Sequence, residues 1–100
     1  MPVLNMSIPH SLPKEEAMYR MKRFLSNLRI RYAEEVDDVQ EFWQANLARF
    51  DLIVRGKHLA GTLEVEEREI LVALNYPPED EPNISHMEAH IRDVVEPILR

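Results

Sequence analysis

The residues best suited to metal chemistry are two histidines and an aspartate close together in the sequence. His86 and His90 are four residues apart, and Asp93 follows three residues later. On a helix this spacing places the three side chains along one face, where they could hold a zinc ion. That face lies beside the polar side of the expected helix, and the chain has no cysteine to add a thiolate ligand. We therefore expect a solvated helix face and no metal site.

Two other groups of residues could supply a nucleophile or an acid–base pair. His10 and Ser11 are adjacent, but a nucleophilic serine needs a base and a third group that orients this base. Because Ser11 stands where a helix should begin, a capping role is favoured. The carboxylates Glu34, Glu35, Asp37, Asp38 and Glu41 form a hydrophilic run typical of a solvated turn. We expect no catalytic residues, no cofactor and no enzymatic activity.

A basic segment stands out in an otherwise acidic chain. Residues 14–31 contain six lysines or arginines and two glutamates, a local charge of +4, whereas the whole chain carries −6. A basic amphipathic helix can dock on an anionic surface, although a plain solvated face is the alternative. The candidate interaction surface consists of residues of this helix: Tyr19, Arg20, Arg23 and Ile30.

Composition narrows the classes of protein further. The chain of 100 residues is 45% hydrophobic and 30% charged, which predicts a single globular domain over residues 1–100. Its net negative charge argues against a nucleic-acid binder. No apolar run reaches the length of a membrane span, and the start lacks the pattern of a secretory signal. Since the chain also has no cysteine, we expect a cytoplasmic protein; the composition does not predict an oligomeric state.

The hydrophobic pattern predicts two helices and about five strands. A short strand over residues 1–10 precedes a helix that runs from residues 11–13 to about Glu35, with an apolar stripe that includes Met21 and Leu28. Alternating segments at 39–43, 47–55, 59–65 and 70–76 predict an antiparallel meander. Gly56 indicates a turn, and Gly61 indicates a bulge or a close approach of another element. A loop over 77–83 leads to a second helix, which Ser85 and Glu88 should cap.

These elements predict a two-layer α+β fold of order β-α-β-β-β-β-α. Both helices should cover one face of an antiparallel sheet of about five strands. Small residues at Ala48 and Gly61 could leave a cavity between the sheet and the C-terminal helix. The expected shared core consists of Phe24, Leu28, Phe50, Leu52, Leu63, Val72 and Ile91.

Three stretches carry a family resemblance that spans nearly the whole chain. They are residues 10–17 (His-Ser-Leu-Pro-Lys-Glu-Glu-Ala), residues 39–43 (Val-Gln-Glu-Phe-Trp) with Leu47 and Phe50, and residues 56–65, which end in Gly-Thr-Leu-Glu-Val. With them the chain resembles the polyhydroxyalkanoic acid system proteins, a family of small bacterial proteins. The resemblance implies a non-enzymatic accessory or interaction protein, associated with storage-polyester granules, that binds a protein or the anionic granule surface. The alternative function is a small carrier that holds an apolar ligand in the cavity described above.

Overall fold

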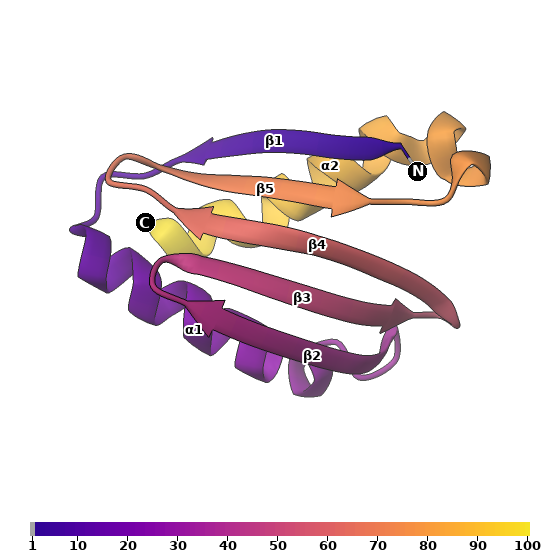
Figure 1. Cartoon of the computed structure of the whole chain (residues 1–100), viewed down its shortest axis with the longest axis horizontal. Coiled ribbons are helices and arrows are strands. Elements are labelled where there is room, and N and C mark those ends of the chain that lie inside the picture. Colours follow the sequence, from indigo (N-terminus) through magenta and orange to yellow (C-terminus); the bar gives the residue numbers. More distant parts are fainter. Residues whose placement is uncertain (1) are drawn as a thin grey trace.

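Figure 1 shows a computed structural model of the chain, which describes residues 2–100. It has the predicted α+β fold and element order, with five antiparallel strands and two α-helices. The elements are β1 (Val3–Pro9), α1 (Lys14–Arg31), β2 (Val36–Gln44), β3 (Leu47–Val54), β4 (Lys57–Val65), β5 (Glu69–Asn75), the 3-10 helix η1 (Pro78–Asn83), α2 (Ile84–Val95) and the 3-10 helix η2 (Glu96–Leu99). Met1, at the start of the expected first strand, lies outside the described residues. Within residues 2–100, no helix is long and apolar enough to cross a membrane.

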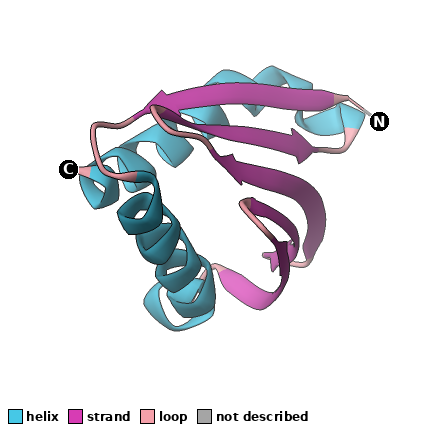
Figure 2. Cartoon of the chain, turned by 60° about the vertical axis from the view of Figure 1, so that its left-hand side comes forward, coloured by secondary structure: helices cyan, strands magenta, loops and turns pink. Residues whose placement is uncertain are grey.

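The order of the strands explains why α1 lies across the sheet. The spatial order is β1-β5-β4-β3-β2, so the first two strands of the chain form opposite edges. Five strands are ~19 Å wide at ~4.8 Å per spacing, and the 18 residues of α1 span ~27 Å at ~1.5 Å per residue. The helix is therefore long enough to connect the two edges. Figure 2 shows both helices on the same face, with the sheet curling around α1.

Burial follows the predicted alternation and gathers the inward side chains into one core. Along β1 and β5 every second residue is buried, and α1 packs mainly on β2 while α2 packs on β1. The predicted core is confirmed as one cluster. Leu28, Phe50, Leu63 and Val72 are buried within it, and Phe24, Leu52 and Ile91 pack against it partly buried.

The boundaries around the first helix differ from the prediction. Helix α1 ends at Arg31 rather than near Glu35, and β2 begins at Val36 rather than Val39. A tight turn links them, in which the N–H groups of Glu35 and Val36 both donate to the carbonyl of Tyr32. The side chain of Val36 is buried, and Val36 pairs with Val54 before a register shift at Asp38. Burial of Val36 thus extends β2 beyond its predicted start, and the acidic residues around Val36 explain why the sequence did not indicate this. The expected loop at 77–83 also differs, because it contains η1.

Both predicted serine caps are wrong. Pro13 precedes α1 and Asn83 precedes α2, and neither helix start has a side-chain cap hydrogen bond. The side chain of His10 bonds the segment just before α1 without capping the helix. Its Nδ1 accepts the backbone N–H of Leu12 at 3.2 Å.

Glycine is needed at positions 56 and 61 for different structural reasons. Gly56 lies in the β3–β4 turn with φ +78°, a conformation that other residues adopt at a cost, and a Cβ there would meet nothing within 4 Å. Gly61 confirms the predicted close approach. A Cβ there would collide with the carbonyl oxygen of Ala73 and would lie 2.9 Å from the ring of Phe50. The expectation that Gly61 opens a cavity is therefore wrong, because the neighbouring strand and the Phe50 ring occupy that space.

Candidate functional site

The basic residues of α1 are mostly without carboxylate partners. In the described part of the chain, only Arg20 among them forms an ion pair, with Glu16 at 3.0 Å. Lys22 lies over the Trp43 ring, 5.5 Å from its centre, and Arg23 donates to the neutral Tyr19 hydroxyl at 3.3 Å. The positive charge predicted for this helix is therefore left largely unneutralised.

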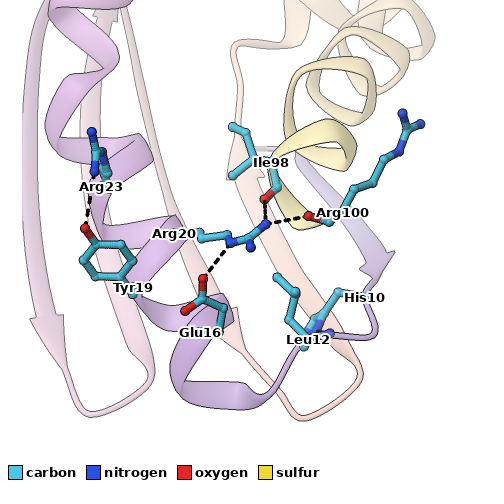
Figure 3. A network of polar contacts seen from close by, with 8 residues as sticks. All are labelled: His10, Leu12, Glu16, Tyr19, Arg20, Arg23, Ile98 and Arg100. Atoms are coloured by element: carbon cyan, nitrogen blue, oxygen red, sulfur yellow. Dashed lines mark hydrogen bonds and ion pairs between the residues drawn. The ribbon is translucent and has the colours of Figure 1, made fainter.

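The four residues of the candidate interaction surface do not form one patch. Tyr19 and Ile30 are 58% and 78% exposed, but eleven residues separate them, which is ~16 Å along a helix. Tyr19 contacts Arg23 through the hydrogen bond drawn in Figure 3. Arg20 reaches from α1 to the last turn of the chain. The structure brings Tyr19 and Arg23 together and places Arg20 and Ile30 on different flanks of α1.

Arg20 is engaged inside the molecule. Its Nε donates to Glu16, and its Nη1 donates to the carbonyl oxygens of Ile98 at 2.9 Å and Arg100 at 2.6 Å. These bonds satisfy carbonyls at the end of η2, which would otherwise lack partners in the last turn. Arg20 thus fastens η2 to α1 (Figure 3). Sequence spacing placed Arg20 on the polar side of the helix but did not indicate this contact, because the last turn is nearly eighty residues away.

A hollow of about 220 Å³ lies beside this contact, between α1 and η2. Its lining combines three arginines and an amide with two apolar side chains: Arg20, Arg23, Phe24, Asn27, Arg31 and Ile98. Every charged group in this set is a cation that only donates hydrogen bonds. The arrangement suits a small anion.

A larger hollow, of about 730 Å³, opens on the other flank of α1, against β2. Its lining is mainly apolar, with three polar side chains: Leu25, Ser26, Arg29, Ile30, Ala33, Val39 and Glu41. Glu41 belongs to the predicted acidic run but faces α1, where its Oε1 accepts the Ser26 hydroxyl at 3.1 Å. Its Oε2 is buried without a hydrogen-bond partner among the described residues. The register shift at Asp38 turns Glu41 inward, and no local pattern in the sequence marks that shift.

The structure gives His10 a structural role. His10 is buried, and its Nε2 lies 2.9 Å from the carbonyl oxygen of Glu66 while its Nδ1 accepts the Leu12 N–H. A carbonyl on one side and a donor on the other place the ring proton on Nε2. Both ring nitrogens are therefore occupied, and neither is free to take a proton from Ser11.

The other residues considered for chemistry lie on the surface. His86, His90 and Asp93 are all exposed on α2, and residues 2–100 contain no group of three such side chains placed to hold a metal ion. In the acidic run, Asp37 accepts the N–H of Gly56 at 3.1 Å, and Glu35 pairs with Arg55 at 3.7 Å. These two acids support the β3–β4 turn.

Two polar contacts that the sequence did not predict hold η1 against the sheet. Lys57 Nζ lies 2.8 Å from Oδ1 of the buried Asp80, and this hydrogen bond and the charge of Asp80 raise the pKa of Lys57. The Tyr76 hydroxyl donates to the Glu81 carboxylate, and this hydrogen bond raises the pKa of Tyr76. The first residue of β4, the residue that follows β5 and two residues of η1 meet here.

Comparison with known proteins identifies no family. No family model matches the chain, and no curated protein matches it. The solved structure of Ara h 8.0201 aligns over 98% of this chain and 97% of that chain, with a TM-score of 0.45 and 8% identity. TTHA0849 from Thermus thermophilus aligns over 98% of this chain and 92% of that chain, with a TM-score of 0.37 and 14% identity. Likeness at this level transfers neither a ligand nor an activity.

Proposed function

We propose that this protein is a non-enzymatic interaction protein that attaches to an anionic surface through α1. The observation that carries the proposal is a set of exposed bases with no carboxylate partner in residues 2–100: Lys22, Arg23, Arg29 and Arg31. On a chain of net charge −6 they concentrate positive potential on one helix. Exposed Tyr19 and Ile30 add apolar contact area on the same element.

The resemblance to polyhydroxyalkanoic acid system proteins suggests which surface this is. Family members are associated with storage-polyester genes, so we propose the anionic surface of a storage-polyester granule as the partner. The helix can make this contact without unfolding, because its apolar stripe stays buried on the sheet while its bases face outward. Attraction between exposed charges is screened beyond ~10 Å at 0.1 M salt, so attachment should weaken as salt rises.

Co-sedimentation with isolated granules over a series of salt concentrations tests this proposal. The variant Arg23→Glu/Arg29→Glu spares Arg20, which fastens η2. Its affinity should fall more than about tenfold, since each base near an anionic surface contributes ~1 kcal/mol. The control Arg49→Glu/Arg68→Glu reverses two exposed charges outside α1 and should bind nearly as well as the wild type. If the affinity for granules changed neither with salt nor in the α1 variant, the proposal would be refuted. Ile53 and Leu71 on the outer face of the sheet would then be the next surface to test.

A second candidate function is carriage of a small apolar ligand in the hollow between α1 and β2. The observation that favours it is the volume of about 730 Å³, which is within the range of ~300–1,000 Å³ typical of ligand pockets. The expected cavity beneath the C-terminal helix is a poorer place, because Val95 and Leu99 are buried in the core there.

Binding of an apolar dye such as Nile red tests this carrier function. Ala33→Trp should obstruct the hollow and weaken saturable binding, whereas Ala89→Trp, on the exposed side of α2, should not. Equal binding by both variants would exclude this hollow as the ligand site.

A further inference from the structure

The hollow between α1 and η2 differs in its chemistry from the rest of the surface. Acidic residues outnumber basic ones 18 to 12 in the chain, yet none of the side chains lining this hollow is an aspartate or a glutamate. Its polar walls are three guanidinium groups and one amide. A hollow with this lining favours an anion and disfavours a cation.

Three of the polar side chains are spaced to converge on one group. Arg23, Asn27 and Arg31 follow one another at intervals of four residues, so they form a ridge along α1 with ~6 Å between successive Cβ atoms. Arginine side chains are long enough to reach from the first and third positions toward the amide of Asn27 between them. A planar guanidinium binds a carboxylate or phosphate group through two parallel hydrogen bonds.

The arginines at the two ends of this ridge are not committed elsewhere. The only hydrogen bond of Arg23 in the described residues is the 3.3 Å contact with the Tyr19 hydroxyl, a neutral acceptor. Arg31 lies 6.0 Å from the centre of the Tyr32 ring, at the outer limit of a cation–π contact. An anion that enters the hollow therefore breaks no ion pair. Arg20, fixed by Glu16 and the η2 carbonyls, leaves its Nη2 without a hydrogen-bond partner among residues 2–100.

The remaining walls and the volume limit the size and character of the anion. Phe24 and Ile98 are partly buried and present apolar surface beside the arginines. A volume of about 220 Å³ is smaller than the ~300–1,000 Å³ typical of the pockets of drug-sized ligands. We infer that this hollow binds a small organic oxyanion, namely a carboxylate or phosphate group that carries a short alkyl group. Arg23 and Arg31 also belong to the proposed attachment surface, but the test of this inference contains no granules, so the two proposals can fail separately.

Titration of the isotope-labelled protein, followed by amide NMR shifts, tests the site with four probes. Butyrate and n-butyl phosphate distinguish the two head groups, and acetate and inorganic phosphate report each head group without its alkyl chain. Saturable shifts confined to residues 23–31 and the last turn are expected with at least one butyl probe. Because a buried methylene strengthens binding by about fourfold, the two additional methylenes of butyrate should make it bind more than about tenfold more tightly than acetate, and n-butyl phosphate should gain at least as much over inorganic phosphate. Absence of saturable shifts, or equal binding of long and short probes, would overturn the inference.

Variants then separate a defined site from general positive charge. Asn27→Asp places a carboxylate at the middle of the ridge with almost no change in shape, and it should lower affinity for the bound probe more than about tenfold. Arg23→Gln/Arg31→Gln should do the same. The matched control Arg29→Gln/Arg49→Gln removes two exposed charges that do not line this hollow, and its affinity should stay within about twofold of wild type. Full affinity in Asn27→Asp, or an equal loss in the control, would refute the site.

Discussion

The helices α1 and α2 cover the same face of the sheet but use their arginines differently. On α2, Arg92 lies 3.5 Å from Glu88 and 3.9 Å from Glu96, and it donates to the Ser7 carbonyl of β1 at 3.0 Å. On α1, Arg23 has only a neutral partner and Arg29 has no ion pair in the described residues. The arginine of α2 therefore serves the fold, whereas most of the charge of α1 does not.

The buried faces of the two helices account for this difference. α1 buries four side chains, whereas α2 buries only Val95 and is followed by η2, which buries Leu99. With so little apolar area, the α2 side depends on polar anchors: Arg92, Arg20 from α1, and the contacts of η1. α1 is held by its core contacts, so its outer side chains are available to a ligand or partner. A charged residue therefore indicates function best where apolar burial already secures its element.

Removal of a shared core side chain should have the largest effect and should not distinguish the two helices. Phe50 lies in the single core cluster, so Phe50→Ala should lower the free energy of unfolding by about 3–5 kcal/mol. The matched control is Phe42→Ala on the outer face, where Phe42 is 66% exposed, with an expected change below about 0.5 kcal/mol. Urea denaturation measures both. Similar losses in the two variants would contradict the inward register of β3.

A methyl group added at Gly61 should disturb the packing of β4 against its two neighbouring strands in the sheet beneath the helices. Gly61 pairs with Phe50 of β3 and Leu74 of β5, and the added Cβ would press on the Ala73 carbonyl. Gly61→Ala should therefore cost about 1–3 kcal/mol, the usual range for overpacking. Gly56→Ala, which is strained only by its positive φ, should cost about 1 kcal/mol. Thermal unfolding of the two variants measures this difference. If Gly56→Ala proved the less stable of the two, β4 would have room to move at Gly61.

Period-two and helical patterns were enough to predict the architecture, because one buried face of each element carries them. The inward set of β5 (Ile70, Val72 and Leu74) was predicted residue by residue and is confirmed. Boundaries were predicted less well where polar residues surround one buried side chain, as at Val36. Local capping rules failed at Ser11 and Ser85, because Pro13 immediately precedes α1 and α2 already begins at Ile84, one residue before Ser85.

The candidate site could be predicted only in part. The concentration of charge on α1 and the exposure of Tyr19 and Ile30 follow from helix periodicity, a local property. The engagement of Arg20 depends on Ile98 and Arg100, and the lining of both hollows depends on which element lies beside each flank of α1. These are contacts between distant parts of the chain, which local patterns in the sequence do not reveal.

The two helices should respond differently to loss of an arginine. Arg92→Ala removes two ion pairs and a hydrogen bond to β1, so it should lower the free energy of unfolding by about 1 kcal/mol. Arg29→Ala removes a charge that contributes no ion pair, and its effect should be below about 0.5 kcal/mol. Chemical denaturation at low and high salt should show the Arg92 effect shrinking with salt. If Arg29→Ala were the more damaging change, the charge of α1 would be structural and the comparison between the helices would be wrong.

The smallest effect should be a loss of stability on the α2 side at alkaline pH. Hydrogen bonds to Asp80 and Glu81 raise the pKa of Lys57 and of Tyr76 in the folded protein. Each contact therefore stabilises the fold fully below the unfolded pKa, near pH ~10, and loses this contribution as pH rises through the higher folded pKa.

The variant Lys57→Met/Tyr76→Phe removes both titrating groups. The difference in unfolding free energy between wild type and variant should be constant at neutral pH and shrink above pH ~10. Amide hydrogen exchange should report this loosening first in η1 and leave α1 protected, because none of the polar anchors of η1 touches that helix. A pH-independent difference between the two proteins, or early exchange in α1, would mean that these contacts do not anchor the α2 side.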